Sequence, residues 1–282
     1  MNILSVQSEV VYGHVGQGAA RFALQCLGHE VWAVPSVLLS SHAGYATVAG
    51  EPVAADLMGR LIGGLEVNGW LDACDAVLSG YLGQAEQAQV VADAVRRVKR
   101  GRPEALYCLD PVFGDEGRAY AKRGVAEAMA KTLLPLADIV TPNAFELANL
   151  ASVPVRNPEE ALEAARRLGR PLVLATSVPD DEGRIGTLAV TAEEAWLVST
   201  PRFDRAPHGA GDLVAALFLA HRLQQTPLRD ALAHTVATVF RLLQEANRSN
   251  SDEIPLIAKQ AILRKRVEIK PEFEIRALRS RT

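Results

Sequence analysis

The chain has 282 residues, and its 30 lysines and arginines nearly balance its 33 aspartates and glutamates. This balance excludes the broad basic surface that nucleic-acid binding requires. Apolar residues make up 49% of the chain, which excludes extensive disorder. The length is compatible with one large domain or two smaller ones.

The three cysteines, Cys26, Cys74 and Cys108, are far apart and odd in number. We expect them to be reduced and to pack in or near the core, because free cysteine behaves as a small apolar residue. The N-terminus lacks the pattern of a signal peptide, and no apolar run is long enough to cross a membrane. These features predict a soluble, cytoplasmic protein without a membrane partner.

Short apolar runs alternate with helical patterns along the whole chain. In the first half, strands are expected at 2–6, 31–34, 76–79, 105–109 and 139–140, and helices at 16–27, 84–100 and 124–134. In the second half, strands are expected at 172–176, 186–191 and 195–199, and helices at 143–150, 158–168, 209–224, 228–244 and 255–264. This alternation predicts an α/β fold with an open, mostly parallel central sheet and helices on both faces.

No linker of Pro, Gly and Ser divides the sequence, and no internal repeat is present. We therefore expect residues 1–282 to form a single domain. The tail from about residue 266 is expected to be peripheral, and its arginine-rich end at 276–282 to be frayed and solvated.

Polar residues follow several of the expected strands. Open α/β sheets bind ligands beyond the carboxyl ends of their strands. Four elements are expected at that edge: Asp110, the Thr141-Pro-Asn143 turn, Thr176 with Ser177, and the helix start Gly209-Ala-Gly-Asp212. Because they come from distant parts of the chain, their convergence predicts one ligand site.

The segment Gly209–Asp212 has the chemistry of a phosphate site. Two glycines at a helix start let backbone N–H groups approach an anion, which the helix dipole also favours. Asp212 lies in the first turn, where a carboxylate can take the proton from a substrate hydroxyl as it attacks phosphorus. The structural alternative is an ordinary helix start with glycine for packing.

Further carboxylates lie near the same edge. Asp110 and Asp115 flank a Pro-Val-Phe-Gly segment, and they either lie near a Mg²⁺–nucleotide or only form a turn. Asn143 and Glu146 have the spacing of a capping box. Functionally, Asn143 would contact phosphate and Glu146 metal-bound water; structurally, the pair would only cap a helix.

Other ligand motifs are excluded. Gly16 and Gly18 form G-x-G, but they come too long after the first expected strand and lack the acidic residue that a dinucleotide fingerprint needs. The chain contains no GxxxxGK[ST], HExxH, GxSxG or paired-cysteine zinc motif.

Seven segments occur together in one order: QSEVVYGHVG (7–16), LLSSHAGY (38–45), LSGYLG (78–83), LDPVFGDEG (109–117), ADIVTPNAFEL (137–147), ATS (175–177) and HGAGDLVAALFLA (208–220). This combination closely resembles the pyridoxal kinase family of the ribokinase-like superfamily, over nearly the whole chain to about residue 245. The resemblance implies ATP-dependent phosphorylation of the 5′-hydroxymethyl group of pyridoxal, giving pyridoxal 5′-phosphate in vitamin B6 salvage.

The resemblance also implies roles for individual residues. Asp212 would be the general base, and the amides of Gly209, Ala210 and Gly211 the anion hole. The vitamer would be bound by Ser8, Val15, His42, Ala43, Gly44, Tyr81 and Asp212. The nucleotide side would comprise Asp110, Asp115, Thr141, Asn143, Glu146, Thr176, Ser177, Arg205, Pro207, His208, Gly209 and Gly211. Mg²⁺ would lie near Asp110 and Glu146, through water; K⁺ and a homodimer are also typical of the family.

The sequence departs from the family pattern in places. GAGD stands where GTGD is usual, Ala43 stands where threonine is frequent, and the lid expected over Gly114–Gly124 lacks the usual hydrophobic-Pro step. A lost hydroxyl contact corresponds to about 0.5–1.5 kcal/mol, so a weaker or altered vitamer preference is expected, and loss of all activity is not required. Two alternatives stay open: a hydroxymethylpyrimidine-type kinase of the same fold, and a B6- or PLP-binding protein of low activity.

Overall fold

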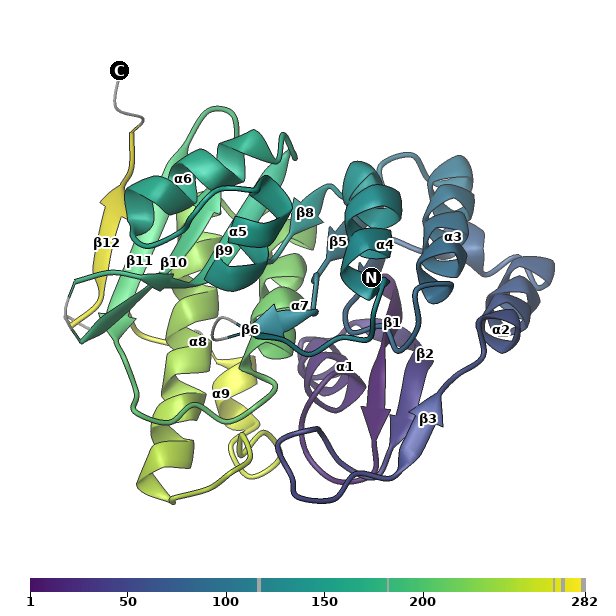
Figure 1. Cartoon of the computed structure of the whole chain (residues 1–282), viewed down its shortest axis with the longest axis horizontal. Helices are drawn as coiled ribbons and strands as arrows, with labels where there is room; N and C mark the ends of the chain where they lie inside the picture. Colours follow the sequence, from purple (N-terminus) through teal and green to yellow (C-terminus); the bar gives the residue numbers. More distant parts are fainter. Residues whose placement is uncertain (116–117, 182, 266, 270–271, 280–282) are drawn as a thin grey trace.

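A computed structural model describes residues 1–115, 118–181, 183–265, 267–269 and 272–279. A ten-stranded sheet runs through the molecule (Figure 1), in the order β12-β11-β10-β9-β8-β5-β4-β1-β2-β3. Its strands are β1 (Asn2–Val10), β2 (Glu30–Leu39), β3 (Gly50–Pro52), β4 (Ala76–Ser79), β5 (Leu106–Leu109), β8 (Ile139–Val140), β9 (Leu172–Pro179), β10 (Arg184–Val190), β11 (Ala195–Pro201) and β12 (Glu274–Ala277). A separate small hairpin consists of β6 (Gly114–Asp115) and β7 (Arg118–Ala119).

The six strands from β9 to β2 are parallel, and β10, β11, β12 and β3 run antiparallel to their neighbours. The helices are α1 (Gln17–Cys26), α2 (Ala55–Val67), α3 (Gln87–Gly101), α4 (Val125–Ala128), α5 (Ala144–Ala151), α6 (Pro158–Arg167), α7 (Ala210–Leu223), α8 (Leu228–Arg248) and α9 (Ala261–Arg264). Short 3₁₀ turns span Leu71–Ala73 and Leu134–Leu136, and a π turn spans Met129–Leu133. The expected open, mostly parallel sheet is confirmed.

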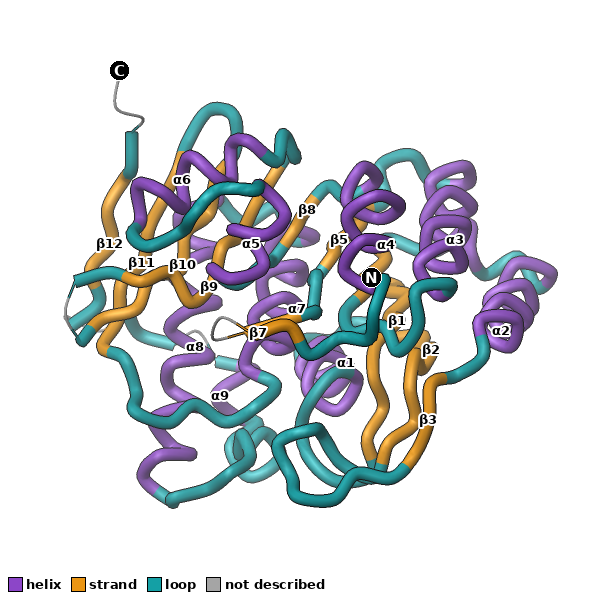
Figure 2. Tube along the Cα trace, viewed as in Figure 1, coloured by secondary structure: helices purple, strands orange, loops and turns teal. Residues whose placement is uncertain are grey.

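Helices cover both faces of the sheet (Figure 2). One core packs α1, α7 and α8 against the sheet, and the opposite face carries one core under α2 and α3 and another under α5 and α6. Every residue of α7 from Leu213 to Ala220 is buried, because this helix packs between α1 and α8. The start of α7, where Asp212 lies, is therefore attached to a rigid element.

Several predicted elements need correction. The strands expected at 2–6 and 31–34 extend to Val10 and Leu39, because polar residues such as Gln7 are buried and hydrogen-bonded in the sheet centre. The sequence reading missed α2, which contains Gly59, Gly63 and Gly64; glycine lowers helix propensity, and here tertiary packing of Met58 and Ile62 compensates.

The C-terminal predictions were partly wrong. The helix expected at 255–264 is reduced to Ala261–Arg264, with turns before it. The tail is not frayed at Arg276: β12 pairs with β11, and Arg276 forms an ion pair with the buried Asp180 at 2.9 Å. Residues 280–282 lie outside the described residues. Cys74 and Cys108 are buried and Cys26 is partly buried against the core, all three with free thiols.

Within the described residues, no helix combines the length and apolar character needed to cross a membrane.

Candidate active site

The polar residues expected after three strands lie side by side at the carboxyl edge of the sheet. The backbone ladder continues past the strand ends, since the N–H of Asp110 donates to Ser79 at 2.8 Å and that of Thr141 to Leu109 at 2.9 Å. The N–H of Thr176 donates to the Pro142 carbonyl at 2.9 Å, and Thr176 forms a bridge with Asn143. This part of the predicted constellation is therefore brought together by strand pairing.

Asp110 and Glu146 are the two buried carboxylates among the residues that the sequence predicted to bind the nucleotide. Asp110 Oδ1 accepts a hydrogen bond from Thr141 Oγ1 at 2.8 Å. Burial and the nearby charge of Asp212 raise the pKa of Asp110 to about 8, against the lowering effect of that hydrogen bond. Asp212 is thus close enough to Asp110 to disfavour the ionisation of Asp110.

The predicted capping box at the start of α5 is confirmed. Asn143 Oδ1 accepts from the Glu146 N–H at 2.9 Å, and Glu146 Oε2 accepts from the Asn143 N–H at 3.0 Å. Glu146 Oε1 also accepts from the Phe113 N–H at 3.0 Å and the Gly114 N–H at 3.3 Å, and burial and then Asp110 raise the Glu146 pKa. Glu146 therefore joins α5 to the 113–114 backbone, beside Asp110.

Gly209 begins α7 in a left-handed conformation, with φ of 89°. A Cβ there would lie 1.9 Å from the His14 carbonyl oxygen, so only glycine fits. Gly16, with φ of 51°, is equally restricted, because its Cβ would lie 2.2 Å from Ser8 Oγ. The N-terminal motif and the GAGD motif therefore lock together at this point.

Asp212 lies in the first turn of α7 and is partly exposed. Burial raises its pKa to about 6, while hydrogen bonding to the backbone of Gly16 and of Asp212 itself lowers it. A carboxylate with this pKa is mostly ionised at neutral pH and can still accept a proton, which suits a general base. Gly211, one residue before it, is exposed, and a Cβ there would meet open space.

The N-terminal residues that the sequence predicted to bind the vitamer lie near α7. Ser8 is buried at a register shift between β1 and β2, a type of irregularity that often re-aims side chains beside active sites. Val15 is buried beside Gly209, and Tyr81 is partly buried, which raises its pKa.

The 41–45 loop carries a cluster of aromatic rings. The His42 ring lies 4.6 Å from that of Tyr45 and 4.5 Å from that of His208, measured between centroids. The Tyr12 ring packs edge-on against Tyr45 at 5.7 Å. Ala43 and Gly44 at the tip of the loop are exposed. The structure thus brings His42 and His208, from opposite ends of the chain, into contact.

The remaining predicted residues lie in separate segments. Ser177 is exposed in a left-handed conformation with φ of 53°, and Asp115 is exposed in the β6–β7 hairpin. Arg205 forms an ion pair with Asp252, while Pro207 is buried in the same segment before α7. Residues 116–117 of the expected lid lie outside the described residues.

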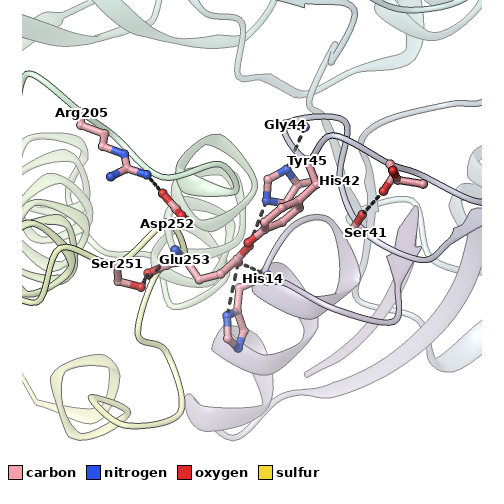
Figure 3. Close-up of polar contacts among 10 residues, drawn as sticks. His14, Ser41, His42, Gly44, Tyr45, Arg205, Ser251, Asp252 and Glu253 are labelled. Atoms are coloured by element: carbon pink, nitrogen blue, oxygen red, sulfur yellow. Dashed lines mark hydrogen bonds and ion pairs between the residues drawn. The ribbon is translucent and has the colours of Figure 1, made fainter.

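Glu253 was not among the residues predicted from the sequence. Its carboxylate accepts hydrogen bonds from Tyr45 Oη at 2.8 Å, from the His14 N–H at 2.7 Å and from His42 Nε2 at 2.9 Å (Figure 3). It stands in the segment SDEIPL, which has no motif, so no signal in the sequence marks it.

Comparison with known proteins identifies the family. The phosphomethylpyrimidine kinase family model matches residues 71–256. The chain is 46% identical over 271 residues to a pyridoxal kinase of Rubrobacter xylanophilus, covering 93% of both chains. It is 41% identical to a pyridoxal kinase of Corynebacterium diphtheriae, covering 96% of this chain and 99% of the relative. This chain belongs to the pyridoxal kinase family.

Solved structures of the pyridoxal kinase family share the fold. The Leishmania donovani pyridoxal kinase in complex with ADP and pyridoxamine matches with a TM-score of 0.92 and 29% identity, covering 99% of both chains. A putative phosphomethylpyrimidine kinase from Bacteroides thetaiotaomicron matches with a TM-score of 0.88 and 25% identity, covering 97% of each chain. The ribokinase-like architecture expected for a pyridoxal kinase is thus confirmed.

Proposed function

We propose that this chain phosphorylates the 5′-hydroxymethyl group of pyridoxal with ATP and forms pyridoxal 5′-phosphate for vitamin B6 salvage. The observation that carries this proposal is Asp212, a carboxylate with a pKa of about 6 in the first turn of a helix opened by glycine. It stands where the strand-end residues and the N-terminal loops meet. The relatives at 40–46% identity are all named pyridoxal kinase.

In the proposed reaction, Asp212 accepts the hydroxyl proton as the oxygen attacks the γ-phosphorus of ATP. The O–P bond to the vitamer forms while the bond to the ADP oxygen breaks. The N–H groups of Gly209, Ala210 and Gly211 stabilise the negative charge on the transferring phosphoryl group. Most of the rate enhancement then comes from positioning and electrostatics, because phosphoryl transfer needs little covalent chemistry from the protein.

The strand-end residues form the proposed nucleotide side. Asp110, Thr141, Asn143, Thr176 and Ser177 lie on consecutive parallel strands or just after them, where α/β proteins bind nucleotides. Arg205, Pro207 and His208 border the start of α7. The lid expected over Gly114–Gly124 stays a prediction.

The donor set fits Mg²⁺ held partly through water. Asp110 supplies a carboxylate of which one oxygen accepts a hydrogen bond from Thr141. Both oxygens of Glu146 already accept hydrogen bonds from backbone N–H groups. Among the described residues, no three His, Cys, Asp or Glu side chains form a metal cluster, and Mg²⁺ typically needs only one or two carboxylates. When bound, Mg²⁺ neutralises phosphate charge; Asp110 would be its main anchor and Glu146 would hold the neighbouring backbone. K⁺ stays a prediction.

A hydroxymethylpyrimidine-type kinase is the second candidate, because the matching family model and the Bacteroides thetaiotaomicron neighbour are both named as phosphomethylpyrimidine kinases, which act on a related pyrimidine. Its reaction would use the same Asp212. A decisive assay measures product formation from pyridoxal and from hydroxymethylpyrimidine, with ATP and Mg²⁺, for the wild type and for Asp212→Ala. We expect phosphorylation of pyridoxal by the wild type only. Equal rates in both proteins would contradict the kinase proposal, and a shared zero would favour the B6-binding protein.

We also propose that the chain forms one domain, since the single large sheet contains strands from both ends of the chain, and that it acts in the cytoplasm as a homodimer.

A homodimer is supported by exposed apolar side chains around α2, where a two-fold axis would bury the same patch from both copies. This surface comprises Leu57, Leu61, Val67 and Trp70, beside a groove lined by Trp32 and Leu65. Leu61→Glu is expected to give monomers in sedimentation velocity; unchanged dimers would place the interface elsewhere.

A further inference from the structure

Glu253 follows α8 in a segment whose backbone is fixed on both sides. The Glu253 N–H donates to Ser251 Oγ at 3.1 Å, and Ser251 Oγ donates to the Glu253 carbonyl at 2.8 Å. Ile254 and Leu256, directly after it, are fully buried in the core beneath α7 and α8. The side chain therefore projects from a rigid base.

The carboxylate of Glu253 joins two loops that the proposed function places around the vitamer. Oε2 accepts from the His14 N–H at 2.7 Å, in the loop before α1. Oε1 accepts from the Tyr45 hydroxyl at 2.8 Å, in the 41–45 loop. Gly13 allows this approach, since a Cβ there would lie 2.9 Å from Glu253 Oε1.

The hydrogen bond with His42 also defines the histidine tautomer. The Gly44 N–H donates to His42 Nδ1 at 3.1 Å, so Nδ1 acts as the acceptor in this ring. Nε2 then carries the proton and donates it to Glu253 Oε1 at 2.9 Å. Because His42 also stacks with Tyr45 and His208, its ring is held on three sides.

Glu253 is an ionised acceptor in this arrangement. Burial alone would raise its pKa, but hydrogen bonds from Tyr45, the His14 N–H and His42 outweigh burial and lower the pKa below the ordinary value. Hydrogen bonds to a charged group are stronger than neutral ones, so one side chain can hold both loops.

We propose that Glu253 is a positioning residue that ties the C-terminal segment to the 12–14 and 41–45 loops and thereby orients His42 and Tyr45 against the B6 vitamer. It acts through these loops and not on the reacting atoms. This inference rests on the proposed function, because the loops matter for catalysis only if they line the vitamer pocket.

The test compares the KM for pyridoxal with the KM for ATP. For Glu253→Ala, the KM for pyridoxal is expected to rise about 10–100-fold, as for the loss of hydrogen bonds to a charged group, with the KM for ATP within about 2-fold. Glu253→Gln keeps one acceptor oxygen and is expected to be intermediate. A purely structural role would lower thermal stability and affect both substrates alike.

Glu245 provides a matched control. Its side chain is as buried as that of Glu253, at 13% against 12% exposed, and it forms ion pairs with Lys259 and Arg248 at 2.7 and 2.9 Å. Glu245→Gln is expected to change stability but neither KM. The proposal is overturned if Glu253→Ala raises both KM values equally, or changes neither.

Two further measurements cover the cases in which Glu253→Ala does not fold or the wild type shows no turnover. If Glu253→Ala does not fold, the pair Glu253→Gln and Tyr45→Phe forms a double-mutant cycle, and additive effects on the pyridoxal KM would overturn the proposal. If the wild type shows no turnover, the proposed function fails by itself. Calorimetric titration with pyridoxal then tests the inference alone, since Glu253→Gln must still weaken binding relative to Glu245→Gln.

Discussion

The two halves of the site are built on different physical principles. On the proposed vitamer side, rings and loops are held by hydrogen bonds to one ionised carboxylate, Glu253, whose pKa is lowered. On the proposed nucleotide side, burial raises the pKa values of Asp110 and Glu146, and a nearby carboxylate adds to the rise in each case: Asp212 for Asp110, and Asp110 for Glu146. The protein's own hydrogen bonds stabilise the charge of Glu253. The ionised forms of Asp110 and Glu146 would instead be stabilised by a positive charge that a ligand brings.

The two halves differ in what they need in order to bind their proposed ligands. The vitamer is an uncharged or weakly charged ring, and a pre-formed pocket of defined shape is enough to orient it. The nucleotide is a polyanion that ionised carboxylates would repel, and this repulsion is the physical reason for the Mg²⁺ proposed above. The near-neutral overall charge is consistent with such a local solution, because the chain has no excess of basic residues to attract phosphate.

Asp212 lies at the junction of the halves, and its loss is expected to have the largest effect. Asp212→Asn should lower kcat about 10²–10⁴-fold with little change in thermal stability, because it removes the proposed general base. In the wild type, kcat/KM should fall as the pH drops below about 6, where Asp212 becomes protonated. A variant that keeps wild-type kcat and the same pH profile would remove Asp212 from the mechanism.

The two glycines before Asp212 differ in the space available for a side chain. Gly209→Ala would place its Cβ 1.9 Å from the His14 carbonyl and force a strained backbone, so we expect destabilisation of about 1–3 kcal/mol or more and severe loss of activity. At Gly211 a Cβ meets open space, so Gly211→Ala should keep the melting temperature and affect only turnover. Equal melting temperatures for both variants would contradict the interlocking of the two motifs.

Asp110 tests the nucleotide half. Its pKa is raised from 3.8 to about 8, so the folded state holds a proton that the unfolded state releases, and stability is lost as the pH rises from about 4 to 8. Asp110→Asn removes this loss, so its gain in melting temperature without Mg²⁺ should grow across that pH range. Activity should fall about 10-fold, with a higher Mg²⁺ requirement. A constant difference in melting temperature would show that Asp110 ionises normally.

The smallest expected effect lies on the vitamer side. Ala43→Thr restores the hydroxyl that is frequent in the family, and one hydrogen bond of about 0.5–1.5 kcal/mol corresponds to roughly a 2- to 10-fold lower KM for pyridoxal. The KM for ATP should not change, and Ala43→Val serves as the control of similar shape. If valine lowers the KM as much as threonine, the effect is packing and not a hydrogen bond.

The sequence predicted most of the fold and the motif-bearing part of the site. Alternating strand and helix patterns indicate a parallel sheet, and the carboxyl edge of such a sheet collects Asp110, Thr141 and Thr176. The capping box of Asn143 and Glu146 was recognisable because its donors and acceptors lie within four residues. Helix α2 and strand β12 were missed, because tertiary packing and pairing with β11, not local propensity, stabilise them.

The reaction class could be predicted from the sequence, because the seven segments that resemble pyridoxal kinases are short and keep their order along the chain. How the loops at 12–14 and 41–45 are held became visible only in the folded structure. Glu253 lies 208 residues from Tyr45 and 211 from His42 along the chain, and a contact at such separation leaves no periodic or local pattern. It forms because α8 and the buried Ile254 carry the chain back to the N-terminal loops, where a single carboxylate can accept hydrogen bonds from both.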